Sequence, residues 1–241
     1  MIDYGDRARI GFLIPSGNRV VEAELRALLP SGVAPVFTRL PLRGSSEEEL
    51  LAMLGRLEEA ARLIADAGPD LICFHCTAVS TFAPAMAADI TARIAAATGL
   101  PAAATADAIL AALEAFGARR LVLATPYLAA VHAREVAFLE SHGRQVLGGA
   151  MLGLATNAEM AALPPDRLAQ LARDALGASA PGAEALFLSC TAVRSAPLIA
   201  ALEQSLGLPV ITSNQAMAWY ALRRCGIAGG AAGFGRLMGL P

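Results

Sequence analysis

The chain has 241 residues, of which 56% are hydrophobic and 17% charged, and its formal net charge is −2. This composition is typical of a globular protein with one large or two small domains, and it excludes a disordered chain. The small net charge gives no reason to expect a nucleic-acid partner, and no apolar run is long enough to span a membrane.

Short apolar strands alternate with helical stretches along the first half of the chain. We expect strands at 10–14, 36–40, 71–75 and 101–105. We expect helices at 18–29, 47–67, 83–98 and 107–116. The helix at 47–67 has acidic residues in its first turn, where the helix dipole favours negative charge.

The second half repeats this alternation. We expect strands at 121–125, 146–154, 185–189 and 210–213, and helices at 128–141, 166–176, 196–205 and 215–224. The pair Gly148-Gly149 inside one strand indicates a bend or a bulge. Because strands and helices that alternate in this way form parallel sheets covered by helices, the sequence predicts an α/β fold.

Matching segments in the two halves indicate an internal duplication. The clearest match is between Phe74-His75-Cys76-Thr77-Ala78-Val79 and Leu188-Ser189-Cys190-Thr191-Ala192-Val193. Segments 10–15 and 99–102 match 121–126 and 207–210 at nearly the same spacing. We therefore expect two pseudosymmetric Rossmann-like lobes with parallel sheets, 1–105 and 106–213, with a cleft between them. The C-terminal segment 214–241 is expected to pack on the first lobe.

Cys76 and Cys190 each follow a predicted buried strand, and ligands of open parallel sheets bind beyond the C-terminal ends of strands. Backbone N–H groups of the turns that follow, such as that of Ala192, can bind a carboxylate and lower the pKa of the thiol. Thr77 and Thr191 add hydroxyl groups to the same turns. The alternative interpretation is a pair of buried structural cysteines.

Other polar residues are predicted to reach the same cleft. Ser16 and Asn18 follow the first strand and Tyr127 follows the mid-chain strand, although Asn18 could be only a helix cap and Tyr127 only a packing residue. Thr156-Asn157 could likewise be a cap or a turn.

The remaining cysteines and the histidines offer no further chemistry. Cys73 and Cys76 are three apart across a strand, so their side chains point to opposite faces and do not form a redox pair. Cys225 is also expected to be without chemistry, and His75, next to Cys76, should point away from it. No cluster has metal-ligand spacing, so we expect no metal.

Together these residues resemble the aspartate/glutamate racemase superfamily, and within it the maleate cis–trans isomerases and arylmalonate decarboxylases. The resemblance extends from the first strand to the tail Gly233-Phe234-Gly235-Arg236-Leu237. It implies an active site with one or two cysteines in the cleft between the lobes, and no cofactor.

The subtypes of this superfamily differ in the polar residues around the cysteines. The decarboxylases keep only the second cysteine, so the presence of Cys76 counts against that activity. The isomerases carry both cysteines and add residues that Asn18, Tyr127 and Asn157 match here. The resemblance thus implies an isomerase of a small unsaturated dicarboxylate, of the maleate-to-fumarate type, with Cys76 as nucleophile and Cys190 as acid and base.

Three alternatives stay open at this point: a racemase that uses both thiols as an acid/base pair, an arylmalonate-decarboxylase-like enzyme, and a silent binding protein. The N-terminus shows no export pattern, so we expect a cytoplasmic protein with reduced thiols. Apolar helices such as 83–97 and 110–116 also lead us to expect a homodimer or a larger homo-oligomer.

Overall fold

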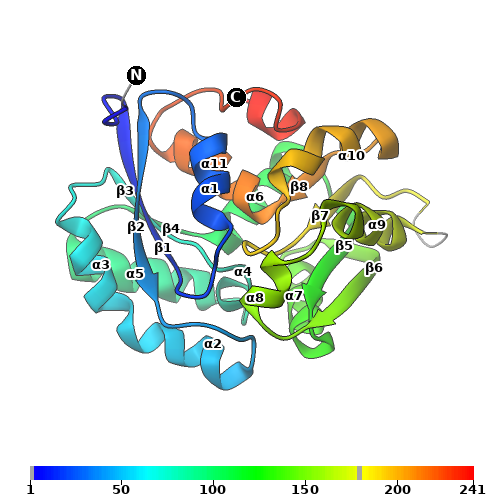
Figure 1. The fold of residues 1–241 in the computed structure, drawn as a ribbon, viewed down its shortest axis with the longest axis horizontal. Coiled ribbons are helices and arrows are strands. Elements are labelled where there is room, and N and C mark those ends of the chain that lie inside the picture. The colour runs from blue at the N-terminus through cyan, green and yellow to red at the C-terminus, as the bar shows by residue number, and fades with distance from the viewer. Residues whose placement is uncertain (1–2, 178–180) are drawn as a thin grey trace.

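A computed structural model describes residues 3–177 and 181–241. The chain forms two four-stranded parallel sheets with the same internal order, β2-β1-β3-β4 and β6-β5-β7-β8, and helices flank both of them (Figure 1). The predicted α/β class with two similar parallel sheets is confirmed, and the matching strand orders agree with an internal duplication.

The first sheet and its helices follow the predicted order. Its strands are β1 Ala8–Pro15, β2 Val33–Leu40, β3 Leu71–Phe74 and β4 Ala102–Ala104. Its helices are α1 Val21–Leu28, α2 Glu47–Met53, α3 Leu57–Ala65, α4 Thr77–Ser80, α5 Met86–Thr98 and α6 Thr105–Ala115. The helix predicted over 47–67 is interrupted by a 3₁₀ turn, η1 Leu54–Arg56, whose Leu54 is buried with α2 and α3 in one apolar cluster. The short helix α4, directly after Cys76, was not predicted.

The second sheet repeats the first. Its strands are β5 Arg120–Tyr127, β6 Gln145–Leu154, β7 Ala185–Leu188 and β8 Val210–Thr212. Its helices are α7 Ala129–Ser141, α8 Asn157–Ala161, α9 Pro165–Leu176, α10 Ile199–Leu206 and α11 Ser213–Arg224, with 3₁₀ turns η2 Ala196–Leu198 and η3 Arg236–Gly239. The predicted irregularity at the Gly148-Gly149 pair is confirmed, because the register of β6 against β5 shifts between the partners of Leu121 and Val122.

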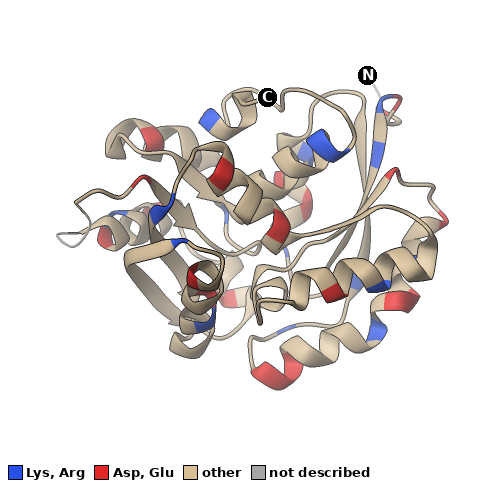
Figure 2. Ribbon diagram, turned by 180° about the vertical axis from the view of Figure 1, so that it is seen from behind, with Lys and Arg blue, Asp and Glu red and all other residues tan. Residues whose placement is uncertain are grey.

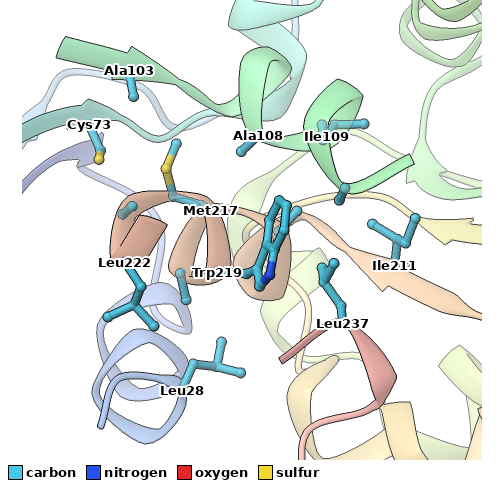
Figure 3. Packing of buried hydrophobic residues seen from close by; sticks show 14 of the residues in the cluster. Leu28, Cys73, Ala103, Ala108, Ile109, Ile211, Met217, Trp219, Leu222 and Leu237 are labelled. Carbon is cyan, nitrogen blue, oxygen red and sulfur yellow. The ribbon is translucent and has the colours of Figure 1, made fainter. Parts of the chain in front are cut away.

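Helices α6 and α11 join the two halves. They pack against each other, and α6 contacts both β4 and β8 while α11 contacts both β3 and β8. Figure 3 shows their apolar side chains, among them Ile109, Met217 and Trp219, in one cluster with Leu28 of α1 and Cys73 of β3. Beyond α11, the N–H of Ala231 donates to the carbonyl of Leu28. The proposed lobe boundaries therefore run through a shared core, and they stay a prediction.

Acidic and basic positions are interspersed over the helices of both halves (Figure 2). Within the described residues, no helix is both long and apolar enough to cross a membrane.

Candidate active site

Cys76 and Cys190 face one small cavity at the C-terminal ends of β3 and β7. The cavity has a volume of only about 20 Å³ and is lined by Pro15, Leu42, Gly44, Ser45, Leu50, Cys76, Thr77, Ala78, Tyr127, Asn157, Met160, Cys190 and Thr191. Cys76 and Cys190 are only 4% and 3% exposed. A space of this size holds little more than a water molecule, so a ligand fits between the two thiols only when the surrounding loops move apart.

Cys190 has an unusual backbone. Its φ is +99°, the only positive φ of a non-glycine residue among residues 3–177 and 181–241. This conformation brings its Sγ within 3.3 Å of the N–H of Ala192, which donates to it, and its own N–H donates to Ser213 Oγ at 3.1 Å. Such conformations cost about 1–3 kcal/mol and cluster at functional sites, so the surroundings hold this thiol in place against strain.

The thiols are not acidified, contrary to the sequence-based expectation. Burial raises the pKa of both Cys76 and Cys190 to about 12. The backbone N–H groups of Ala78 and Val79 do lower the pKa of Cys76, as does that of Ala192 for Cys190, but desolvation of the thiolate outweighs them. Both cysteines are therefore neutral thiols at neutral pH.

Four of the predicted binding residues line the cavity with the cysteines: Thr77, Tyr127, Asn157 and Thr191. The hydroxyl of Tyr127 hydrogen-bonds to Cys190, which lowers the pKa of that thiol. Burial, followed by the nearby Cys190 and Glu135, raises the pKa of Tyr127 well above its usual value. Tyr127 is thus a neutral hydrogen-bond donor beside Cys190.

The other three predicted binding residues do not line the cavity. Ser16 is an exposed residue, and its hydroxyl accepts from the N–H of Leu42 at 3.1 Å, which ties two loops together. Ala192 contributes its backbone N–H to Cys190. Asn18 caps α1 by accepting from the N–H groups of Val20 and Val21, and its Nδ2 donates to Thr191 Oγ1 at 3.0 Å. Asn18 therefore reaches the cavity only through Thr191.

Ser213, at the start of α11, links the two cysteine turns and was missed in the sequence. Its Oγ accepts from the N–H of Cys190 at 3.1 Å and from the hydroxyl of Thr77 at 2.9 Å. The sequence signal was the match between the segments that follow Pro101 and Pro209, which places 213 at the start of a helix in the second half.

A buried hydrogen-bonded chain behind the cavity was also missed. The Nδ2 group of Asn214 donates to Glu24 at 2.7 Å and to the carbonyl of Thr191 at 3.2 Å, so its Oδ1 faces His75 Nε2 at 2.9 Å. An amide oxygen only accepts, so His75 carries its proton on Nε2. Burial lowers the pKa of His75 to about 4, which leaves the ring neutral.

His75 therefore acts from behind the cavity. Its Nδ1 lies 3.0 Å from Thr105 Oγ1, and it does not line the space between the thiols, as expected for a side chain that points away from Cys76. The hydrogen bonds among Glu24, Asn214 and His75 hold His75, the residue before Cys76, in place. Asn214 also holds Thr191, the residue after Cys190. Cys73 and Cys225 lie outside the cavity and are free thiols.

Two loops close the cavity towards solvent. Gly44, after β2, pairs in a β-bridge with Thr156, and Ser45 Oγ donates to the carbonyl of Ala155 at 3.0 Å. The N–H of Asn157 donates to the carbonyl of Arg43 at 3.1 Å. A ligand can enter only if these loop contacts open.

Glu135 of α7 is a buried carboxyl beside the site. It is 1% exposed, Oε1 accepts from Ser189 Oγ at 2.7 Å, and Oε2 has no partner among the described residues. Burial raises its pKa from 4.5 to about 8, so at neutral pH it is protonated.

Stability should fall as the pH rises through the window set by Glu135. The folded protein binds this proton more tightly than the unfolded chain does. The proton's contribution to the free energy of unfolding is therefore complete below pH 4.5 and is lost between pH 4.5 and about 8. The glutamine in Glu135→Gln stays neutral at every pH. We expect the free energy of unfolding of this variant to rise relative to that of the wild type across this window, by at most about 5 kcal/mol. Urea unfolding at several pH values measures the difference, with the exposed Glu140→Gln on the same helix as control. Parallel pH profiles for wild type and Glu135→Gln would contradict the assignment.

The described residues hold no group of three or more His, Cys, Asp or Glu side chains that could bind a metal ion. The geometry instead brings together two neutral thiols, a phenol, two hydroxyls and an amide. This set can add a sulfur to a substrate, or exchange protons with it, from two sides.

Known proteins are similar to this chain in sequence and in fold. The model of the arylmalonate decarboxylase family matches residues 10–238. The chain belongs to this family. Two curated relatives are a maleate isomerase of Nocardia farcinica, 33% identical, and an arylmalonate decarboxylase of Bordetella bronchiseptica, 31% identical. Each alignment covers 95% of both chains.

A solved structure from the family shows the chemistry of a cysteine. It is a mutant of the Nocardia farcinica maleate cis–trans isomerase with a covalently bound succinylcysteine intermediate. Its TM-score to this chain is 0.89 at 27% identity, over 96% of this chain and 98% of that one. The family therefore includes both isomerases and decarboxylases, and at least one member forms a covalent bond between cysteine and a C4 dicarboxylate.

Proposed function

We propose that this protein is a cofactor-independent cis–trans isomerase of a small unsaturated dicarboxylate, of the maleate-to-fumarate type. The observation that carries the proposal is the pair of thiols, Cys76 and Cys190, on the wall of one small cavity. The covalent intermediate in the Nocardia farcinica isomerase supports it.

The proposed reaction begins when Cys76, as a thiolate, adds to C2 of the double bond. The electron pair of the double bond moves towards the carboxyl group at the far end, and C3 then takes a proton from Cys190. The bond between C2 and C3 is now single and rotates. Cys190 takes the proton back from C3, the carbon–sulfur bond breaks, and the trans product leaves with the Cys76 thiolate restored. Two lower barriers thereby replace the high barrier to twisting a double bond.

This reaction requires the state in which Cys76 is a thiolate and Cys190 keeps its proton. The pKa of about 12 for each thiol makes the Cys76 thiolate a minor species at neutral pH. The proton of Cys76 must therefore pass to solvent before the addition step, while Cys190 keeps its own, and kcat/KM should rise with pH across the neutral range.

The neighbouring polar groups have separate roles in the proposal. Tyr127, a neutral phenol against Cys190, donates to the negative charge that builds up on the substrate carboxyl during addition. Thr77, Thr191 and Asn157 hold the two carboxylates from the cavity wall. Asn18 and Ser213 orient Thr191 and Thr77 through their hydrogen bonds.

Arylmalonate decarboxylation is the second candidate, and the 31% identity to the Bordetella bronchiseptica enzyme favours it. In the decarboxylases of the superfamily, one cysteine, the second, protonates the enediolate; here Cys76 stands as an additional thiol.

A substrate panel separates the candidates. We expect maleate to give fumarate without added metal or cofactor, measured by proton NMR, and phenylmalonate to be inert. Conversion of phenylmalonate with no conversion of maleate would move the assignment to the decarboxylase. Deuterium exchange at the α-carbon of an amino acid, with neither of these reactions, would indicate a racemase.

The cytoplasmic location and the homodimer are further parts of the proposal. Helix α6 is largely buried within the chain against α11, so the apolar surface that suggested a dimer is now mainly that of α5, where Ala88, Ala92, Ala95 and Ala96 are exposed. Light scattering at working concentration measures the mass, and a monomer would contradict the dimer.

A further inference from the structure

A second hollow, on the outer side of the loops that close the cavity, is rich in arginine. We call it the arginine hollow; it is lined by Ser16, Gly17, Asn18, Arg19, Arg39, Arg43, Thr156, Asn157 and Ala158. No acidic side chain is among these residues. Asn157 also lines the cysteine cavity, so one side chain belongs to the wall of both spaces.

The three guanidinium groups differ in how they are held. Arg39 lies 2.5 Å from Glu22 and donates to the carbonyls of Ser16 and Asn18 at 3.0 and 2.9 Å. Arg19 and Arg43 are exposed, and neither has a side-chain hydrogen bond or ion pair within residues 3–177 and 181–241. The guanidinium groups of Arg19 and Arg43 are therefore free to bind carboxylate oxygens, and the planar geometry of a guanidinium matches that of a carboxylate.

A narrow seam separates the arginine hollow from the cysteine cavity. The carbonyl of Leu42 accepts from the N–H of Gly17 at 3.0 Å and from Asn157 Nδ2 at 3.3 Å. A Cβ on Gly17 would lie 2.9 Å from that carbonyl oxygen and 3.2 Å from Asn157 Nδ2, so the seam is tightly closed. It consists of loop contacts between residues 16–18, 42–45 and 155–157, and such contacts open at low free-energy cost.

We propose that the arginine hollow is the entry site of the enzyme, where a dicarboxylate dianion docks on Arg19 and Arg43 before the seam opens past Asn157. This rests on the proposed function for the identity of the substrate. Two unpaired cations that line one hollow raise the local concentration of an anion there, and salt screens this attraction beyond about 10 Å. Movement of the Asn157 side chain away from Leu42 then gives the anion a path between the two spaces.

The test uses alkylation of the cavity thiols, which reports entry whether or not the protein is an isomerase. Iodoacetate is an anion and iodoacetamide is its neutral analogue, and mass spectrometry of the peptides follows Cys76 and Cys190 separately. In Arg19→Gln/Arg43→Gln we expect iodoacetate to react about fivefold more slowly than in the wild type at low salt, with iodoacetamide unchanged. About 1 M salt should remove the difference.

The control is Arg62→Gln/Arg167→Gln, which removes the same charge from two exposed positions outside the arginine hollow and should leave both rates unchanged. Equal slowing of both reagents in Arg19→Gln/Arg43→Gln, or no slowing of either, would overturn the entry site. An equal loss for iodoacetate in the control pair would overturn it too, because net charge alone would then explain the effect. Maleate turnover is scored independently, so its absence would count against the proposed function and leave this result intact.

Discussion

Cys76→Ala should lose isomerisation of maleate almost completely, with kcat lower by at least about 10⁴-fold. The substitution removes the only atom that can form the covalent bond from this side of the cavity. Its neighbours Thr77 and Tyr127 keep their positions, because their hydrogen bonds go to Ser213 and to Cys190 rather than to Cys76. Proton NMR of maleate and fumarate measures the rate over long incubations.

Binding separates a chemical loss from a structural one. Succinate, the saturated analogue of the substrate, should bind Cys76→Ala about as tightly as the wild type, measured by calorimetry. The matched control is Cys225→Ser, a half-buried cysteine outside the cavity, which should keep full activity. If Cys76→Ala kept its isomerase rate, the covalent mechanism would be wrong.

The same variant also distinguishes the two family activities. Delivery of a proton from Cys190 to an enediolate needs no thiol on the opposite side, so a decarboxylase would keep turning over phenylmalonate without Cys76. An isomerase would show neither reaction in this variant.

The repeat in the sequence was sufficient to predict the two sheets and the meeting of the two cysteines. Both follow buried strands in matching segments, and the strand order of the second sheet repeats that of the first. Tyr127 was predicted to reach the cavity because it follows a predicted strand, and Asn157 because it matches a residue of the isomerases.

The sequence could not predict the protonation of the thiols. A turn of backbone N–H groups after a strand suggests a low pKa, but the opposing cost depends on how completely the other half of the chain covers the sulfur. The residues that line the cavity, among them Tyr127 and Met160, leave only 4% of Cys76 and 3% of Cys190 exposed, so water is excluded from both thiols. These contacts join residues far apart in the chain, and no local pattern records them.

The buried chain behind the cavity escaped prediction for the same reason. Glu24 looks like an ordinary charge in the first turns of a helix, and Asn214 like a helix cap. Only the packing of α11 against α1 brings them to 2.7 Å. The desolvation of Glu24, which raises its pKa, is then partly offset by the hydrogen bonds from Asn214, Ser195 and Ala196.

Cys190→Ser should have a different phenotype from Cys76→Ala. Cys76 remains and can still add to the double bond, whereas a serine hydroxyl is a far weaker acid and is poorly suited to taking the proton back from C3. We expect kcat to fall by about 10³-fold, within the usual range for loss of a general acid and base. Because the later steps need Cys190 more than the addition does, enzyme with substrate bound to Cys76 should accumulate.

Intact-protein mass spectrometry after acid quenching measures this adduct. We expect Cys190→Ser to gain the mass of one substrate molecule, located on the peptide of Cys76, while Cys76→Ala gains none and the wild type shows only a transient signal. The Nocardia farcinica mutant with its succinylcysteine shows that such an adduct can persist in a related enzyme. An adduct on Cys190 in the Cys76→Ala variant would reverse the two roles. The hydrogen bond between Tyr127 and Cys190, which lowers the pKa of that thiol, would then activate a nucleophile.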